Sequence, residues 1–365
     1  MPAVPANLPD LVRAAFVRAR AAGDLTFFPT QVALLRVQGV PFQLRFAPAL
    51  AKKPKAESQR EDTKDDEGHA GGGDKTPYDP FEAPPPGLVV CPEVNGGTHR
   101  LVLNKFAVSQ DHAILATTAW RPQSHLLAPA DLAAAYACIA AYAARGEALY
   151  VFYNSGRHSG ASQPHRHLQL LPVAPMRAGL AGDAVDEWQV LADKLLDDHA
   201  AVPFCVAAAR IRGDDGGDGN DGDNGRAPSA EQLHATYLDL YRQARAAAHG
   251  TAAVVPGASG VDVDVDAAAE EAGAVPASIS YNLALTHRTM ALLPRTAEGG
   301  ADKQYHLSLN GTVLAGTALV KNEAEWDALR SDPGRLGGVL AQIGVSPTEA
   351  KAGTVVRERP SPSAL

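Results

Sequence analysis

Cysteine is scarce in this chain, with three residues among 365. The three (Cys91, Cys138 and Cys205) are odd in number and far apart along the sequence. This pattern excludes a disulfide framework and gives no sign of a cysteine-based zinc site. We therefore expect buried free thiols and a reducing compartment.

Long apolar runs are also missing. No stretch approaches the roughly 20 apolar residues of a membrane helix, and the N-terminus lacks the apolar segment of a secretory signal. We expect no membrane partner and a cytoplasmic location. The arginines at positions 13, 18 and 20 faintly resemble an organellar transit peptide. The apolar residues between Leu8 and Ala19 nevertheless fall on one helical face, which predicts a first amphipathic helix of the fold.

An excess of positive charge is absent as well. The formal net charge is -8, so a general affinity for nucleic acid is not expected. An anionic substrate would have to be held by a local basic site. With 45% apolar and 20% charged residues, the composition is that of a globular protein, and the length suffices for one elaborate domain or two lobes.

Three segments contain too few apolar residues to offset the entropy of ordering, and we predict them to be solvated insertions. They are residues 55–76, 213–228 and 251–278. The second resembles half of a calcium loop but lacks the closing glutamate, so no calcium site is predicted. The organisation expected from these breaks is an N-terminal region (1–212), a linker (213–228), a C-terminal region (229–350) and a tail (351–365).

Between the insertions, short apolar runs alternate with a few helical patterns, which favours an α+β fold over a regular βαβ alternation. Further helices are predicted at 129–145, 230–248 and 323–330. Strands are predicted at 34–40, 41–46, 88–90, 100–104, 114–117, 148–153, 165–172, 280–286, 290–294, 306–310 and 316–321.

The stretch from Asn154 to Gln169 concentrates the chemistry of the chain and reads NSGRHSGASQPHRHLQ. Successive side chains of a strand point to opposite faces, so His165, His167 and Gln169 would share one face. Imidazole is a competent nucleophile at neutral pH, and its attack on phosphorus would split a transfer into two steps. Gln169 cannot titrate and therefore cannot activate water, which favours an acceptor that is already anionic, such as phosphate.

The segment just before the histidines is suited to binding an anion. Glycine lets the backbone approach a ligand, and successive N–H groups can point at phosphate oxygens. Pro164 then fixes the approach into the strand. Taken alone, these residues leave two alternatives open. A His-x-His pair on a strand can hold a metal, although no third ligand is close in sequence and no metal site is predicted. The two histidines can also be ordinary surface or core residues.

The same stretch resembles the signature of the fungal-type diadenosine tetraphosphate phosphorylases, also called ATP adenylyltransferases, of the histidine-triad superfamily. The resemblance extends from about residue 8 to residue 345 and is interrupted by the three insertions. Further matching motifs are Phe46–Pro54, Leu103–His112, Ser280–Thr286, Leu293–Arg295 and Asn310–Lys321.

The resemblance implies a fold of the histidine-triad and uridylyltransferase type, with a mixed, mainly antiparallel sheet and flanking helices. It also implies a nucleotidyltransferase that converts diadenosine tetraphosphate and inorganic phosphate into ADP and ATP. In that reaction a histidine attacks the α-phosphorus, ATP leaves, and AMP stays on the imidazole until phosphate attacks. No covalently bound cofactor is implied, and Mg²⁺ is expected to accompany the polyphosphate.

Roles follow from position in the matched motifs. His167 takes the place of the nucleophile, His165 supports it, and Gln169 fills the third position of the triad. Asp111 replaces another acidic residue of the family, and Thr317 replaces a methionine. The residues that match nucleotide or phosphate contacts are Lys53, Asn104, Lys105, Asn154, Ser159, Gly160, Ala161, Ser162, Gln163, Asn310, Thr317 and Lys321.

Two further readings compete with this one. A hexose-1-phosphate uridylyltransferase uses the same His-x-His-x-Gln chemistry on a nucleotide sugar, but the motifs around Lys53, Lys105 and Lys321 favour the phosphorylase. The second alternative is a non-catalytic sensor of dinucleoside polyphosphates. The presence of both His167 and Gln169 argues against it, because a binding protein does not need the catalytic residues.

Overall fold

The computed structural model describes residues 4–52, 78–196, 202–211, 227–249, 273–300 and 307–347. Insertion 55–76, most of 213–228 and of 251–278, the tail 351–365 and Lys53 lie outside these ranges.

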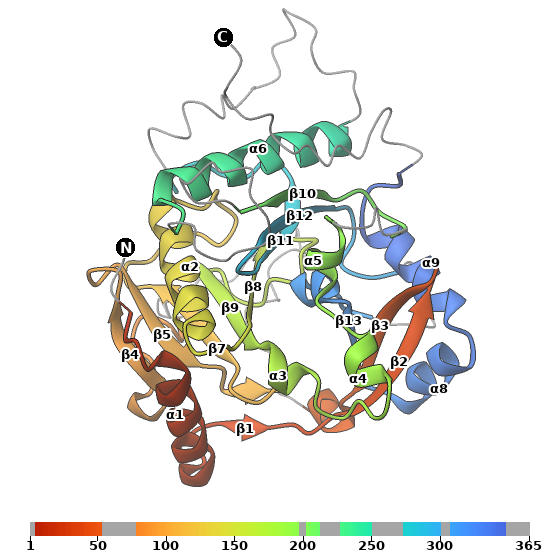
Figure 1. Cartoon of the computed structure of the whole chain (residues 1–365), viewed down its shortest axis with the longest axis horizontal. Coiled ribbons are helices and arrows are strands. Elements are labelled where there is room, and N and C mark those ends of the chain that lie inside the picture. The colour runs from red at the N-terminus through yellow and green to blue at the C-terminus, as the bar shows by residue number, and fades with distance from the viewer. Residues whose placement is uncertain are drawn as a thin grey trace, which may run out of the picture.

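An eight-stranded antiparallel sheet forms the centre of the molecule, in the order β10-β12-β11-β8-β9-β7-β5-β4 (Figure 1). This arrangement confirms the α+β fold with a mainly antiparallel sheet. Because β8 pairs with β11, the N-terminal and C-terminal regions share one sheet. The strands are Val89–Val94 (β4), His99–Leu103 (β5), Ala113–Thr117 (β7), Leu149–Ser155 (β8), His167–Pro172 (β9), Ala207–Arg210 (β10), Ser280–Leu285 (β11) and Thr289–Arg295 (β12).

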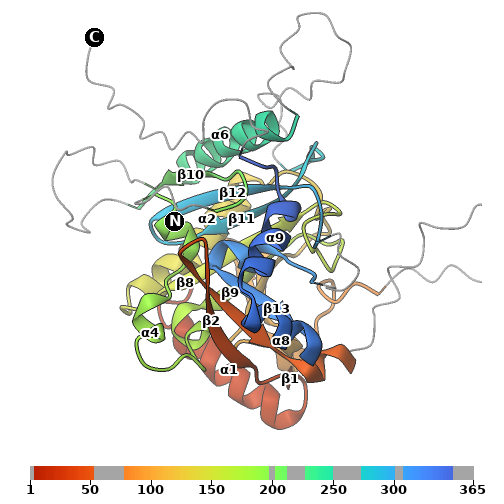
Figure 2. The same ribbon diagram turned by 90° about the vertical axis from the view of Figure 1, so that its right-hand side faces the viewer.

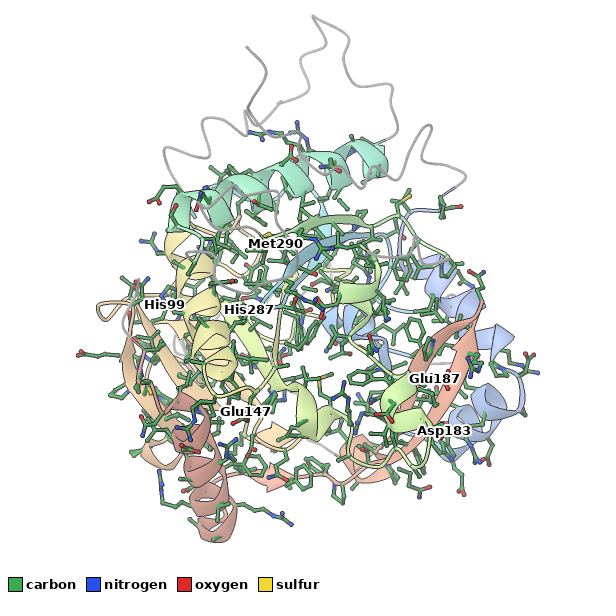
Figure 3. The ribbon with its side chains drawn as sticks, in the orientation of Figure 1. His99, Glu147, Asp183, Glu187, His287 and Met290 are labelled. Carbon is green, nitrogen blue, oxygen red and sulfur yellow. The ribbon has the colours of Figure 1, made fainter. Side chains whose placement is uncertain are left out.

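Three helices cover one face of this sheet, namely α1 (Leu8–Ala22), α2 (Pro129–Ala143) and α6 (Ala230–His249) (Figure 1). The predicted apolar face of α1 is buried against the sheet. Met290 of β12 lies in the apolar layer beneath α6 (Figure 3). This face is therefore closed by side-chain packing.

The opposite face is covered in two separate parts. One cover is a second sheet of order β13-β3-β2, with helices α8 and α9 outside it (Figure 2). The other is Phe81, which packs on Val102, Ile114 and Ala116. Strand β9 runs along the boundary between the two covers. The new elements are β2 (Gln31–Val37), β3 (Val40–Phe46), β13 (Thr317–Val320), α8 (Glu323–Ser331) and α9 (Gly334–Ile343).

Short elements complete the described fold. A two-stranded parallel pair joins β1 to β6 and ties the start of the second sheet to the loop after β5. The short elements are β1 (Thr26–Phe27), β6 (Phe106–Ala107), α3 (Val173–Met176), α4 (Ala184–Glu187), α5 (Leu191–Lys194) and the 3-10 helices η1 (Pro48–Lys52), η3 (Pro86–Leu88) and η4 (Gly311–Ala315).

Several predicted boundaries need correction. The first hairpin turns at Gln38 and Gly39, both at positive φ, so β2 ends before the turn and β3 begins at Val40. The strand predicted at 306–310 is wrong over residues 307–310, because Asn310 caps η4 and the backbone of Leu309 binds Arg295 and Glu298 instead of a ladder. Its first residue lies outside the described ranges. No described helix is long and apolar enough to cross a membrane.

Candidate active site

The two histidines and the glutamine lie on one face, as predicted from the two-residue period. His167 pairs with Ala116 and Gln169 with Ile114 across β7, and those partners lie on the face under Phe81. His165 precedes the strand and forms an isolated bridge to Pro122.

His167 presents one free ring nitrogen. Its Nδ1 lies 2.8 Å from the backbone oxygen of His165, and a carbonyl only accepts, so the proton must be on Nδ1. Nε2 then carries the lone pair, and it has no hydrogen-bond partner among the described residues. Burial, opposed by the bond to His165, lowers the pKa of His167 to about 4. The imidazole is therefore neutral and nucleophilic at pH 7.

His165, in contrast, has both ring nitrogens engaged. Its Nδ1 lies 2.5 Å from a carboxylate oxygen of Asp79, and its Nε2 lies 2.9 Å from the hydroxyl of Thr117. A ring held at both ends is not available to attack phosphorus. The geometry thus separates the two histidines into a nucleophile and a support, in agreement with their positions in the motif.

Asp79 and Phe81 belong to one short segment that the sequence did not single out. The other oxygen of Asp79 accepts the backbone N–H of Phe81 at 2.9 Å, which fixes the turn around Pro80. The Phe81 ring centroid lies 5.0 Å from that of His167 and 5.7 Å from that of His165. This ring shields the two imidazoles, and the segment holds His165 from the side.

Gln123 forms hydrogen bonds with the backbone of His167, and no motif in the sequence predicts this role. Its Oε1 accepts the N–H of His167 at 2.8 Å, and its Nε2 donates to the carbonyl oxygens of His167 and Asn154 at 3.1 and 2.8 Å. The side chain is buried and bridges β8 and β9 at the end of the two strands that is joined by the loop at residues 156–163, called here the catalytic loop. It fixes the start of β9.

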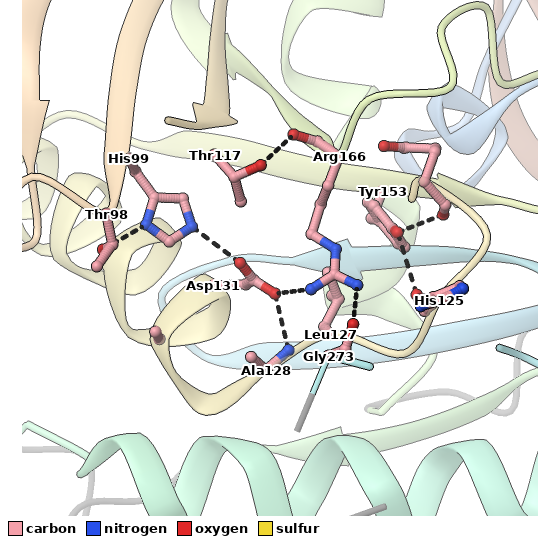
Figure 4. A network of polar contacts seen from close by, with 12 residues as sticks. Thr98, His99, Thr117, His125, Leu127, Ala128, Asp131, Tyr153, Arg166 and Gly273 are labelled. Carbon is pink, nitrogen blue, oxygen red and sulfur yellow. Dashed lines mark hydrogen bonds and ion pairs between the residues drawn. The ribbon is translucent and has the colours of Figure 1, made fainter. Parts of the chain in front are cut away.

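Arg166, between the histidines, anchors the strand from behind, on the helix-covered face (Figure 4). Its guanidinium donates to Asp131 of α2 and to the carbonyl of Gly273, both at 2.9 Å. Asp131 also lies 2.9 Å from His99, and both side chains are almost fully buried. Burial alone would raise the pKa of Asp131, but His99 and Arg166 together hold it below its usual value.

Gln169 is half-buried, and its Oε1 lies 2.9 Å from Nε2 of His112. Asn104 lies on the far side of the same ring, 3.3 Å from its Nδ1. Lys105, the next residue, is exposed, with its ammonium 5.8 Å from the ring centroid of Phe106. The structure therefore brings Asn104 to the Gln169 end of the strand through His112, whereas the ammonium of Lys105 lies over the ring of Phe106.

The loop at 156–163 is held in a conformation that favours glycine. Gly156 and Gly160 have φ of 82° and 75°, and a Cβ on Gly160 would lie 2.9 Å from the Cβ of Asn310. Within the described chain, no acceptor binds the backbone N–H groups of residues 160–163. These four donors include Ala161, the exposed Ser162 and Gln163, and they are free to bind an anion.

A buried polar network supports this loop. Asn154 accepts from Asn282 and from the backbone of Gly311, at 2.9 and 2.8 Å. Asn282 also donates to the carbonyl of Ser159, whose hydroxyl binds Gly156. Asn154 and Ser159 are both fully enclosed, so in this structure their hydrogen bonds hold the loop in place.

The predicted C-terminal contacts are spread out. Asn310 packs against Gly160 and caps η4. Thr317, at the start of β13, is buried, and its hydroxyl has no partner among the described residues. Lys321 is exposed just after β13, beside the end of β3 that leads into η1. The structure brings Asn310 to the catalytic loop but places Thr317 and Lys321 at opposite ends of a strand.

Comparison with known proteins agrees with this geometry. Residues 2–181 match the family model described as the Ap4A phosphorylase N-terminal domain, and residues 200–346 match the ATP adenylyltransferase C-terminal domain. The chain is 27% identical over 363 residues to diadenosine 5',5'''-P1,P4-tetraphosphate phosphorylase 2 of Saccharomyces cerevisiae, covering 95% of this chain and 98% of the yeast protein. It is 31% identical over 177 residues to Protein APA1 of the same yeast, covering 47% and 50% of the two chains.

The fold is also that of a solved structure. The crystal structure of yeast Ap4A phosphorylase Apa2 superposes with a TM-score of 0.69 at 23% identity, covering 94% of this chain and 99% of that one. The crystal structure of the same yeast protein in complex with Ap4A gives a TM-score of 0.65 at 24% identity, covering 94% and 99%.

Proposed function

Because the chain belongs to the Ap4A phosphorylase family, we propose that it converts diadenosine tetraphosphate and inorganic phosphate into ADP and ATP through an AMP–His167 intermediate. The observation that carries the proposal is the neutral ring of His167, whose Nε2 has no partner among the described residues, close in the chain to residues 160–163, whose backbone N–H groups bind no acceptor within the described chain. A nucleophile and an anion cradle in one place suit the chemistry of phosphoryl transfer.

In the first step, the Nε2 lone pair of His167 attacks the α-phosphorus. The bond from this phosphorus to the bridging oxygen of the β-phosphate breaks, and ATP departs with the electron pair. AMP is now bonded to Nε2, and the ring retains its proton on Nδ1. That N–H donates a hydrogen bond to the carbonyl oxygen of His165, with an N···O distance of 2.8 Å, and the negative charge of Asp79 nearby favours the cationic ring.

In the second step, an oxygen of inorganic phosphate attacks the same phosphorus. The phosphorus–nitrogen bond breaks, its electron pair returns to Nε2 and ADP is released. The attacking oxygen is already anionic, so no base is needed. Gln169 fits this requirement because its amide can hold an oxygen but cannot remove a proton.

Charge on the phosphoryl oxygens must be stabilised locally, since the chain has a net charge of -8. The backbone donors of residues 160–163 and the exposed ammonium of Lys105 are available for this. We assign Lys53 the same task from its motif. The described residues contain no group of three or more His, Cys, Asp or Glu that would hold a metal, so a divalent cation such as Mg²⁺ would be bound mainly by polyphosphate oxygens and water.

The direct test is product analysis with purified protein, with and without phosphate. We expect diadenosine tetraphosphate and phosphate to give equimolar ADP and ATP. Conversion of UDP-hexose alone would overturn the proposal in favour of a uridylyltransferase. Labelled diadenosine tetraphosphate without phosphate should leave an acid-labile AMP adduct on the wild-type protein, and no adduct would indicate a binding protein.

We also propose a cytoplasmic location. All three cysteines are free and buried, in agreement with a reducing compartment. A fluorescent fusion of the full chain would test this, and recovery in an organelle would overturn it.

A further inference from the structure

A chain of hydrogen bonds connects a backbone N–H to the amide of Gln169. The N–H of Phe106 lies 2.9 Å from Oδ1 of Asn104, Nδ2 of Asn104 lies 3.3 Å from Nδ1 of His112, and Nε2 of His112 lies 2.9 Å from Oε1 of Gln169. The backbone of Asn104 also binds the carbonyl of His112 at 2.9 Å, which fixes the two residues together.

The direction of this chain is set at its start. A backbone N–H only donates, so the Asn104 atom that receives it is the oxygen, and the amide nitrogen faces His112. That nitrogen donates, so Nδ1 of His112 accepts and its proton is on Nε2. Nε2–H then donates to Oε1 of Gln169. The remaining group of Gln169, its NH2, has no partner among the described residues.

The protonation state of His112 agrees with this direction. Burial lowers the pKa of His112 to about 4, opposed by the bond to Gln169, with the neighbouring His167 lowering it further. A doubly protonated ring would place an N–H against the NH2 of Asn104. His112 is therefore neutral at pH 7, with one donor and one acceptor nitrogen.

We propose that His112 is a positioning residue that turns the amide of Gln169 so that its NH2 faces the phosphoryl group transferred by His167. This inference rests on the proposed function and deepens it. A donor at that place stabilises a phosphoryl oxygen and offers no acceptor to water. If the amide were reversed, its carbonyl oxygen would repel the phosphoryl group and could orient a water molecule.

The tautomer can be measured without turnover. In the wild-type protein labelled with 15N-histidine, we expect the His112 ring to be neutral, with a protonated Nε2 and an unprotonated Nδ1 at pH 7. A ring protonated on Nδ1, or on both nitrogens, would overturn the proposal.

Kinetics test the action through Gln169. We expect His112→Leu to lower kcat by about 10-fold, because the NH2 of Gln169 would no longer be held toward the charged phosphoryl group and that hydrogen bond would be weakened. We also expect a smaller change in KM and a larger share of AMP from hydrolysis. His112→Gln, which keeps a donor toward Gln169, should retain more activity than His112→Leu. In a Gln169→Ala background, His112→Leu should change kcat by less than about 2-fold, because the two changes remove one interaction.

Two comparisons keep the test decisive. Ser109→Ala, a buried hydroxyl without a partner among the described residues, should leave activity unchanged and controls for substitution in this turn. Fully additive losses in the double variant would mean that His112 acts independently of Gln169 and would overturn the proposal. Absence of ADP with the wild-type protein would instead refute the proposed function, while the 15N measurement still reports on the tautomer.

Discussion

The backbone oxygen of His165, two residues before His167 and just ahead of β9, lies 2.8 Å from Nδ1 of His167. The contact fixes the tautomer of His167, and it depends on the backbone of His165, whose side chain is held separately by Asp79 and Thr117. His165 thus supports His167 through its backbone oxygen, while Asp79 and Thr117 hold the ring of His165 in place.

Replacing the nucleophile should abolish the reaction. We expect His167→Ala to lower kcat by more than about 1,000-fold, because no other free imidazole lies on this face of the described sheet. The AMP adduct should also disappear, while the thermal unfolding temperature stays close to that of the wild type. Retention of more than a few per cent of the activity would contradict the assignment.

The pH dependence follows from the lowered pKa values of His112 and His167. Both are about 4 in the folded protein, against 6.5 for an ordinary histidine. Between these values the unfolded chain binds more protons, so the free energy of unfolding should fall as the pH falls from about 6.5 to about 4. The slope approaches about 1.4 kcal/mol per pH unit for each histidine.

Urea unfolding at several pH values would measure this, and His112→Gln should reduce the slope by up to about 1.4 kcal/mol per pH unit, the contribution of that one histidine. The rate kcat/KM should also stay flat down to about pH 5, since His167 remains neutral there. A fall in kcat/KM centred near pH 6.5 would show that His167 titrates normally.

The carboxylate of Asp79 should matter for rate. Asp79→Asn removes the anion 2.5 Å from His165 and the negative charge that favours the cationic ring of His167. We expect kcat to fall by about 10-fold to 100-fold, the effect of losing a charged hydrogen bond. Glu82→Gln, an exposed carboxylate in the same segment, is the matched control and should leave kcat unchanged. Equal losses in the two variants would refute a specific role for Asp79.

The buried pair behind the strand should dominate stability. Asp131→Asn leaves the guanidinium of Arg166 without its counter-charge in the core, and we expect a loss of about 3–5 kcal/mol in the free energy of unfolding, measured with urea. Asp10→Asn removes an exposed carboxylate that also pairs with arginine and should change stability little. A small loss in Asp131→Asn would show that the network is relaxed in solution.

The close approach of the catalytic loop to Asn310 gives a matched pair of glycine variants. Gly160 and Gly146 both have positive φ, but a Cβ on Gly146 meets nothing within 4 Å. Both alanine variants should lose about 1–2 kcal/mol of stability from backbone strain, and Gly160→Ala should lose more because its Cβ would lie 2.9 Å from Asn310 and from the backbone oxygen of Leu309. Only Gly160→Ala should also raise KM for diadenosine tetraphosphate, by about 10-fold, since it displaces the backbone donors. Equal KM values would place the loop away from the substrate.

The sequence predicts local relationships in this site well. The shared face of His165, His167 and Gln169 follows from the two-residue period of a strand, and the long helices follow from their apolar spacing. The residues that complete the site are different, because they meet only through the tertiary fold. Asp79 is 86 positions from His165, His112 is 57 from Gln169, and Gln123 is 44 from His167. No local pattern marks such pairs.

The misassigned strand at 307–310 has the same origin. Its alternation is typical of a strand, but the guanidinium of Arg295 takes the carbonyl of Leu309, and Asn310 turns the chain into η4. A buried side chain from another strand has outcompeted ladder pairing, and the segment instead packs against Gly160.

The pairing of β8 with β11 has a consequence for the evolution of the chain. The two regions matched by separate family models, residues 2–181 and 200–346, contribute neighbouring strands to one sheet, and the side chains of Asn154 and Asn282 bond across that seam. If the two regions were separated, β8 of the first and β11 of the second would each become an unpaired edge strand. The two regions are therefore poor candidates for shuffling into other proteins as free modules, and gene fission between them would have to preserve their association.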